Sequence, residues 1–501
     1  MESLNKETLV PVSLEDYFKP FRENVIGHDL LIETPQGLIP LLYADWVASG
    51  RMYGPIEDIM VDQISPYVAN THTQTTTTGC SMTLAYSRAR QIIKEHTNAY
   101  DEDILISSNS GMTGVVNKFQ RILGFRVHEK YLDKLSLEEK PLIIVSHMEH
   151  HSNQTSWLET IADVRVIEPT DEGLVCLDDL KKILEENKHR ETIIAAITSC
   201  SNVTGIFTPY YDVAEIVHEY GGLCFVDFAC SAPYIDIDMH PADRPNAHLD
   251  AIFFSPHKFL GGPGSTGILI FKKELYTNRI PDNPGGGTVD WTNPWGEHKY
   301  HDEIEAREDG GTPAFLQTIR VGLSIQLKEQ MKVDKIKERE EEIMNIIWPV
   351  MQKIPNLHVL ASNIRDRLSV ISFYIDNLHY NLAVKLLNDR YGIQVRGGCS
   401  CAGTYGHYLL HVTKETSKSI TEKISQGDLT SKPGWIRLSL HPVMSDKQVR
   451  YIGEAITELA ANFDEWAKDY HYSSSMNEFI HNEKGIMEEA VVKNWFNCEL
   501  K

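Results

Sequence analysis

Between about residue 80 and residue 272, short runs of apolar residues alternate with stretches that have the spacing of amphipathic helices. The apolar runs are continuous, whereas a strand with one solvated face would alternate between apolar and polar residues. Continuous runs indicate a sheet buried on both faces, and hence a mostly parallel α/β core. We predict seven strands, at Ile104–Ser107, Leu142–Ser146, Val164–Ile167, Ile193–Thr198, Leu223–Asp227, Ala251–Phe254 and Gly267–Phe271. The helix patterns between them include Met112–Leu123, Leu177–Glu186 and Tyr211–Tyr220.

Polar residues follow several of these strands, close to the point where each strand ends. In parallel α/β sheets, ligands bind beyond the carboxyl ends of the strands. The residues placed in this way are Asn109, His150, Asn202, Asp227 and Lys258. We therefore expect their side chains to converge on one cleft.

The rest of the chain predicts a second, smaller α+β domain, because 501 residues exceed the size at which one core usually stops growing. Glycine-rich loops at 283–287 and 310–313 precede a long charged helix near Gln326–Ile354. Beyond it we predict strands Leu368–Tyr374 and Trp435–Leu440, helices near Leu382–Arg390 and Lys447–Phe463, and a short helix at Glu488–Phe496. We divide the chain into an N-terminal extension that contributes to the small domain (1–42), a large domain (43–325), a small α+β domain (326–465) and a C-terminal tail (466–501).

Composition limits the partners and the compartment. The net charge of -22 argues against nucleic acid or an anionic membrane surface as a partner. No apolar run reaches membrane-spanning length, and the first ten residues lack the apolar core of a signal peptide. Eight cysteines in so long a chain do not form a disulfide scaffold, so we expect a reducing, cytoplasmic environment.

Lys258 is the strongest single candidate for chemistry. It follows the strand Ala251–Phe254 and precedes a glycine-rich turn, within the segment Ser255-Pro256-His257-Lys258. Burial there would lower the pKa of the ammonium, and an amine must lose its proton before it can form a Schiff base. Alone, the pattern would favour an ordinary surface lysine after a strand. However, Asp227 ends another buried strand, as the partner of a pyridinium nitrogen would. The glycines do not form a P-loop, because the lysine precedes them.

This combination of an acid and then a lysine resembles pyridoxal phosphate (PLP) enzymes of fold type I. The finer pattern is similar to class V aminotransferases, in the branch of cysteine desulfurases and selenocysteine lyases, from about Tyr43 to about Leu459. The resemblance implies a large and a small domain, PLP as the cofactor, and Lys258 as its covalent carrier. It also implies that Asp227 keeps the ring nitrogen protonated.

The resemblance also assigns the cofactor's phosphate and ring. The turn Ser108–Thr113 leaves a strand and opens a helix, and its free N–H groups favour an anion. Ser255 and His257 match the two side chains that complete the phosphate site. In the family's E-H-H segment, the first histidine stacks on the ring, and here it is His150. The residues implied at the cofactor are Gly111, Met112, Thr113, His150, Asn202, Asp227, Cys230, Ser255, His257, Lys258 and Thr312.

Two positions of this cofactor set need comment. Asn202 matches the asparagine that contacts the ring hydroxyl. Cys230 stands where the family usually has a glutamine at that hydroxyl, so the ring's electronics and the choice of reaction are open to change. His147, His150 and His151 do not have the spacing H-E-x-x-H, and we predict no metal ligands.

The small domain would supply the substrate site and a nucleophile. Arg437 matches the arginine that clamps the substrate carboxylate, and Arg396 matches a second arginine at the site. Cys401 lies five residues after Arg396 and matches the family's reactive cysteine, although Cys399 is a rival. A thiol in a glycine-rich loop near two arginines is suited to act as a thiolate. The polar insertion at about 412–433 is typical of a mobile loop or lid.

The glycine-rich loops have a further implication in the family. Gly285–Gly287 and Gly311-Thr312-Pro313 match elements that the adjacent subunit inserts into the site, where Thr312 would reach the partner's phosphate. We therefore expect a homodimer with shared active sites.

The best hypothesis for function is removal of sulfur from L-cysteine, giving L-alanine and a persulfide on Cys401. Lys258 would carry the cofactor and move the Cα proton, and a sulfur-acceptor protein is a further possible partner. The alternatives are other class V reactions, namely those of an aminotransferase, a selenocysteine lyase, an epimerase or a C–S β-lyase. A protein that binds PLP without turnover is also an alternative, but the complete set of Lys258, Asp227 and Arg437 argues against it.

Overall fold

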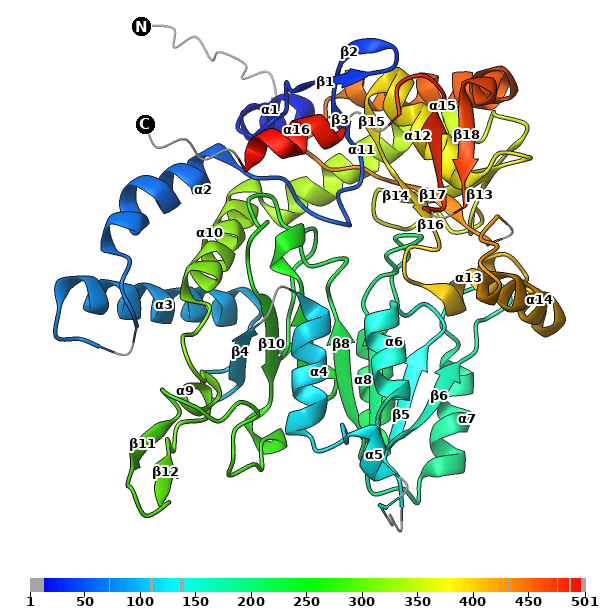
Figure 1. The fold of residues 1–501 in the computed structure, drawn as a ribbon. Coiled ribbons are helices and arrows are strands. Elements are labelled where there is room, and N and C mark those ends of the chain that lie inside the picture. Colours follow the sequence, from blue (N-terminus) through cyan, green and yellow to red (C-terminus); the bar gives the residue numbers. More distant parts are fainter. Residues whose placement is uncertain are drawn as a thin grey trace, which may run out of the picture.

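The computed structural model describes residues 13–71, 73–108, 111–132, 134–135, 139–430, 432–474, 476–485 and 488–496. Asn109 and Ser110, both in the turn predicted to bind phosphate, therefore lie outside the described residues. Figure 1 shows a large sheet with helices on both faces in one half of the molecule, and a smaller sheet with its own helices in the other half.

The large sheet has seven strands in the order β4-β10-β9-β8-β7-β5-β6. Only β10 runs antiparallel to its neighbours β4 and β9. The predicted mostly parallel, seven-stranded sheet is therefore confirmed. Its strands are β4 (Ile104–Ser108), β5 (Leu142–Ser146), β6 (Asp163–Ile167), β7 (Ile193–Thr198), β8 (Leu223–Asp227), β9 (Ala251–Phe254) and β10 (Gly267–Phe271).

Burial on both faces explains why these strands are apolar throughout. In β5, Leu142 and Ile144 pack into one hydrophobic cluster, whereas Ile143 and Val145 pack into another on the opposite face. Helices α4 and α6 contribute to the second cluster, and α7 and α8 to the first (Figure 1). The helices around this sheet are α3 (Thr77–His96), α4 (Met112–Ile122), α5 (Glu129–Leu132), α6 (His151–Leu158), α7 (Leu177–Asn187) and α8 (Tyr210–Glu219).

The smaller sheet is antiparallel, with the order β13-β14-β17-β16. Its strands are β13 (Leu357–Val359), β14 (Val370–Ile375), β16 (Arg396–Gly398) and β17 (Trp435–Ser439). The helices that pack with it or connect it to the large sheet are α10 (Phe315–Met331), α11 (Val333–Met351), α12 (Tyr380–Tyr391) and α15 (Asp446–Trp466). The prediction of one long helix near Gln326–Ile354 is wrong. The structure has two helices there, α10 and α11, which are separated at Lys332, whose φ of +60° no α-helix can accommodate.

The N-terminal segment packs against the smaller sheet and its helices. Phe18 of α1 (Leu14–Glu23) is fully buried in the same cluster as Ile336 and Ile347 of α11. The strand β3 (Leu42–Tyr43) pairs in parallel with β15 (Ile393–Gln394). Residues 13–42 therefore pack with the smaller sheet, whereas residues 1–12 lie outside the described residues. The predicted domain boundaries remain predictions, and residue 326 lies inside α10.

The insertion at 412–433 contains a helix, α14 (Lys414–Ser425), whose N-terminus is capped by Thr413. The prediction of a loop is therefore wrong over these residues.

Across the described part of the chain, every helix is too short or too polar to span a membrane. The other elements are β1 (Leu31–Thr34), β2 (Gly37–Pro40), α2 (Gly54–Asp58), β11 (Val289–Thr292), β12 (His298–Tyr300), α9 (Ile304–Glu308), α13 (Gly403–Leu409), β18 (Tyr470–Ser473), β19 (Glu478–His481), α16 (Glu488–Trp495), a π-helix (Ile59–Ile64) and short 3-10 helices at Ser65–Tyr67, Pro245–Ala247, Pro256–Lys258, Lys273–Leu275 and Ala467–Asp469.

Candidate active site

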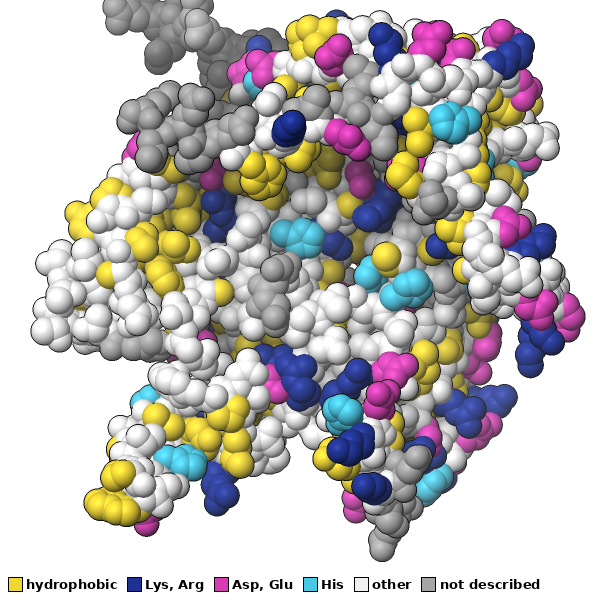
Figure 2. Space-filling model, in the orientation of Figure 1, with side chains coloured by type: hydrophobic (Ala, Val, Ile, Leu, Met, Phe, Trp, Pro, Cys, Tyr) yellow, Lys and Arg dark blue, Asp and Glu magenta, His cyan; other side chains and the backbone are white. Residues whose placement is uncertain are grey.

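A cavity of about 450 Å³ lies at the carboxyl ends of the parallel strands, between the two sheets. Figure 2 shows this face of the molecule hollowed in the middle, with histidine and basic side chains inside the hollow. The predicted site residues that line it are Gly111, Met112, Thr113, His150, Asn202, Asp227, Cys230, Ser255, His257, Lys258, Arg396, Cys401 and Arg437. The structure therefore brings together every predicted site residue that it describes, except Thr312.

Lys258 enters this cavity from a tight 3-10 turn, Pro256–Lys258, that follows β9. The turn folds back on itself so closely that a Cβ on Gly262 would lie 1.9 Å from the carbonyl oxygen of Pro256. Only glycine fits there, which explains the glycine-rich sequence after the lysine. Burial lowers the pKa of Lys258, although Cys230 and Asp227 oppose this effect. The amine is therefore more readily deprotonated than an ordinary lysine.

Asp227 ends β8 beside Lys258. Burial raises the pKa of Asp227 to about 6, although the N–H of Ala229 and the ammonium of Lys258 favour the carboxylate. The Ala229 N–H donates to Oδ1 over 2.8 Å. A buried carboxylate with so few donors is well suited to a cationic partner in the cavity.

His150 presents a neutral imidazole to the cavity. Burial, together with the positive charge of Lys258, lowers its pKa to about 3. Its Nδ1 accepts the Ser152 N–H over 3.1 Å, so the ring hydrogen is on Nε2. The adjacent Glu149 is buried and accepts N–H groups from Ser146 and Thr198, which connects the ends of β5 and β7 beneath the histidine.

The N-terminus of α4 forms the opposite end of the cavity. The first N–H of the helix, from Met112, donates to Oγ of Ser255 over 2.9 Å. Thr113 and Ser152 share a hydrogen bond of 2.6 Å between their hydroxyl groups. Burial lowers the pKa of His257 to about 4, so its ring is neutral at pH 7. Helix N–H groups and hydroxyl groups together make a site for an anion such as phosphate.

Two polar groups in the middle of the cavity have no hydrogen-bond partner among the residues that the structure describes. Asn202 donates its amide N–H to the carbonyl oxygen of Ser400 over 2.7 Å, whereas its buried Oδ1 has no partner among the described residues. Nε of Arg437 is also buried and has no hydrogen-bond partner in the described part of the chain. An unpaired buried polar group is costly, so both groups are expected to meet a ligand.

Arg437 is held in place by its other nitrogens. Nη2 donates to Oδ1 of Asp45 over 2.5 Å, and Nη1 donates to the carbonyl oxygen of Asn202 over 3.2 Å. Arg396 is its partner across the pair β16–β17 and lies at the mouth of the cavity. The sequence analysis missed Asp45, because the two-residue strand β3 that precedes it has no periodicity to detect.

Cys401 is exposed and lines the cavity, whereas Cys399 packs among hydrophobic side chains outside it. Ser400 and Cys401 both have left-handed backbone conformations, with φ of +50° and +57°. His151 anchors the loop, because its N–H donates to the carbonyl oxygen of Cys401 and its Nε2 accepts the N–H of Gly403. Strained backbone held by its surroundings is typical of functional sites.

Thr312 lies outside the cavity of this chain. It is exposed, and its loop contacts the other glycine-rich loop, since the Gly311 N–H donates to the carbonyl oxygen of Gly286 over 2.7 Å. The two predicted loops therefore form one surface feature. Its role towards a second subunit remains a prediction.

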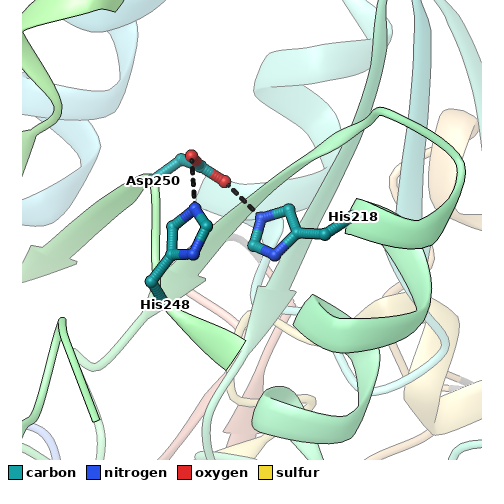
Figure 3. A group of neighbouring side chains, drawn as sticks. All are labelled: His218, His248 and Asp250. Carbon is teal, nitrogen blue, oxygen red and sulfur yellow. Dashed lines mark hydrogen bonds and ion pairs between the residues drawn. The ribbon is translucent and has the colours of Figure 1, made fainter. Parts of the chain in front are cut away.

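A group with metal-ligating side chains lies at the far end of the large sheet, where His218, His248 and Asp250 face one another (Figure 3). The two imidazole rings stack at 4.1 Å with an angle of 15° between their planes. Their lone pairs therefore lie in two separate, nearly parallel planes and do not converge on one point. Nζ of Lys272 lies 3.4 Å from Oδ1 of Asp250, and balances its charge. Hydrogen bonds and ion pairs account for this cluster.

Comparisons with known proteins agree with this geometry. The family described as Aminotransferase class-V matches residues 42–452. A protein named probable cysteine desulfurase from Staphylococcus epidermidis is 30% identical over 368 residues, which cover 72% of this chain and 83% of the relative. Another of that name from Halalkalibacterium halodurans is 28% identical over 367 residues, 72% of this chain and 84% of the relative.

Solved structures show the same fold. The apo cysteine desulfurase from Thermococcus onnurineus has a TM-score of 0.70 at 21% identity, covering 88% of this chain and 97% of that one. The cysteine desulfurase CsdA from Escherichia coli has a TM-score of 0.68 at 21% identity, with 89% and 98% covered. The fold is thus that of PLP-dependent enzymes of fold type I. With a family match across most of its length, this chain belongs to the class V aminotransferases and is a PLP-dependent enzyme of the cysteine desulfurase type.

Proposed function

We propose that this enzyme removes sulfur from L-cysteine and produces L-alanine and a persulfide on Cys401. The observation that carries the proposal is that one cavity holds an amine, a carboxylate clamp and a thiol, from Lys258, Arg437 and Cys401. The names of the relatives support the same reaction.

The cavity fits PLP. The N-terminus of α4 with Ser255 and His257 would hold the phosphate, and Asp227 would pair with the ring nitrogen. The neutral ring of His150 would cover the pyridine face, and the unpaired Oδ1 of Asn202 would meet the ring hydroxyl. When bound, PLP supplies an electron sink that stabilises a carbanion at the substrate's Cα.

Arg437 would bind the substrate carboxylate through Nε and one terminal nitrogen, since Nε is free and the fork of a guanidinium matches a carboxylate. Arg396 at the mouth of the cavity would add attraction for the same anion. Asp45 and the carbonyl of Asn202 keep the guanidinium from turning, which fixes where the Cα hydrogen points.

Lys258 would then act as the base. Because burial lowers its pKa, the neutral amine is available to take the proton from Cα. Cys401 would attack the substrate sulfur as a thiolate. The C–S bond breaks, the sulfur remains on Cys401 as a persulfide, and the three-carbon remainder leaves as alanine.

A second candidate, C–S β-lyase activity, is favoured by the hydrogen bonds that tie the Cys401 loop to His151 and Asn202. A β-lyase releases sulfide directly and needs no mobile thiol.

We also propose a homodimer that shares its sites through the loops at Gly285–Gly287 and Thr312, a sulfur-acceptor protein as partner, and a cytoplasmic location. Hydrophobic side chains gather over the π-helix Ile59–Ile64 and α3 and on the hairpin β11–β12, where a second subunit would pack (Figure 2).

The test is incubation of the PLP-loaded enzyme with L-cysteine. Alanine in equal amount to the sulfur released, with a persulfide mapped to Cys401, supports the proposal. Pyruvate and ammonia would show a β-lyase, and transfer of the amino group to a 2-oxo acid would show an aminotransferase.

Borohydride should attach the cofactor irreversibly to Lys258, and attachment to another lysine would contradict the site. For the dimer, mixing Lys258→Ala with Thr312→Ala should restore activity only if the sites are shared.

A further inference from the structure

Two buried thiols face each other on the floor of the active-site cavity. Cys200 and Cys230 both line the cavity, and their side chains are 0% and 3% exposed. Each donates its S–H to the same acceptor, the carbonyl oxygen of Ser201, over 3.8 and 3.7 Å respectively. Because one oxygen atom accepts from both thiols, the two side chains converge on the same point, and each changes the pKa of the other.

The sheet explains why the two thiols meet. Thr198 at the end of β7 is in register with Asp227 at the end of β8. Cys200 follows the first by two residues and Cys230 follows the second by three, so both leave neighbouring strands at the same edge. Neighbouring strands lie about 4.8 Å apart, which is within the range of Cα separations that a disulfide spans. Between the same two segments, Ser199 and Ser231 also share a short hydrogen bond of 2.6 Å.

The two thiols differ in reactivity. The polar Cys200 side chain beside it, together with the positive charges of Lys258 and Arg437, lowers the pKa of Cys230, although burial opposes this effect. Burial raises the pKa of Cys200 well above that of an ordinary thiol. Cys230 is therefore the better nucleophile, and Cys200 is the thiol placed to react second.

We propose that Cys200 and Cys230 form a disulfide when a small dialkyl disulfide enters the cavity, and that this site is distinct from Cys401. The thiolate of Cys230 attacks one sulfur of the small disulfide and releases one thiol. Cys200 then attacks the mixed disulfide at the sulfur of Cys230, and releases the second. The protein loses two hydrogens, and one small disulfide becomes two thiols.

The disulfide would change cofactor binding, a consequence that rests on the proposed function. Cys230 is the side chain placed at the ring hydroxyl, and in the disulfide its sulfur has no hydrogen to donate. Loss of one hydrogen bond predicts PLP binding that is weaker by roughly 3- to 10-fold. Conversely, PLP in the cavity would cover the two thiols, so the loaded enzyme should oxidise more slowly than the cofactor-free chain.

The experiment uses the full chain with Cys399 and Cys401 both replaced by serine, so that the thiols of the loop cannot react. It is treated with bis(2-hydroxyethyl) disulfide, with and without bound PLP. We expect a mass loss of two hydrogens, a crosslinked peptide pair that contains Cys200 and Cys230, and reversal by dithiothreitol. Adding Cys200→Ser should leave a stable mixed disulfide on Cys230, whereas adding Cys230→Ser should prevent the reaction.

Three results would overturn the proposal: no crosslink in the cofactor-free chain, a mixed disulfide on Cys230 that persists although Cys200 is present, or oxidation at the same rate with PLP bound. Because mass and peptide mapping do not depend on turnover, these results are separate from those that decide the desulfurase reaction. Thermal unfolding of each variant shows whether it is folded, and the double-serine chain without a further change is the matched control.

Discussion

Replacement of Arg437 by lysine tests the carboxylate clamp without emptying a buried site. The lysine ammonium can still pair with Asp45, so no buried charge is left alone. It cannot reproduce the fork that offers Nε and a terminal nitrogen to one carboxylate. A hydrogen bond to a charged group contributes about 1.5–3 kcal/mol, and loss of one such bond predicts a fall in kcat/KM for L-cysteine of about 10- to 150-fold.

The assay compares L-cysteine with 2-aminoethanethiol, which has the same amine and thiol but no carboxylate. Arg437→Lys should reduce sulfur release from cysteine and leave the slow release from 2-aminoethanethiol nearly unchanged. Arg320→Lys is the matched control, since Arg320 forms an ion pair with Glu57 outside the cavity. The absorption of bound PLP should be the same in all three proteins. An equal loss on both substrates would refute the assignment of Arg437 to the carboxylate.

Three further predictions concern other parts of the chain. Cys401→Ser should abolish persulfide formation and leave PLP absorption intact, whereas Cys399→Ser should change sulfur release less than 3-fold; the opposite result would move the nucleophile to Cys399. In the cofactor-free protein, the Asp227 pKa of about 6 against an ordinary value of 3.8 means that the folded state binds more protons between these pH values, so stability from this group falls as the pH rises from 4 to 7. The free energy of unfolding should fall by about 3 kcal/mol over this pH range, and Asp227→Asn should abolish this pH dependence in urea unfolding curves. Lys332→Gly should raise the free energy of unfolding by about 1 kcal/mol with no effect on activity, because only glycine has no cost at a φ of +60°; a lower melting temperature would contradict this.

The large sheet and the residues at its carboxyl ends could be predicted because one rule fixes both. A strand that is apolar throughout must be covered on both faces, and the ends of parallel strands then meet at one edge. Asp227 and Lys258 follow such strands directly, so the sequence places them beside each other although 31 positions separate them. His150 and Asn202 follow from the same argument.

The features that were missed depend on contacts that leave no periodic signal. Asp45 meets Arg437 across 392 positions, through a two-residue strand and an isolated bridge to Ser439. The left-handed conformations of Ser400 and Cys401 occur in residues that rarely adopt them. The helix break at Lys332 interrupts a charged pattern that would otherwise continue through it. In each case the tertiary structure overrides what the local sequence favours.

The loop that carries Cys401 follows β16 of the smaller sheet and is hydrogen-bonded to residues of the large domain, and this limits how sulfur could leave the site. Two hydrogen bonds to His151 and one from Asn202 to Ser400 hold it closed. At about 0.5–1.5 kcal/mol each, opening the loop costs about 1.5–4.5 kcal/mol, which corresponds to an open fraction between about 8% and 0.05%. Loop motions of this kind typically occur on μs–ms timescales, which permits turnover. A thiol held in this way would meet the substrate most of the time and an external acceptor only briefly. Replacing His151 by alanine removes only the side-chain hydrogen bond to Gly403 and keeps the backbone bond to Cys401, so it should modestly speed sulfur transfer to an acceptor and slow the attack on cysteine.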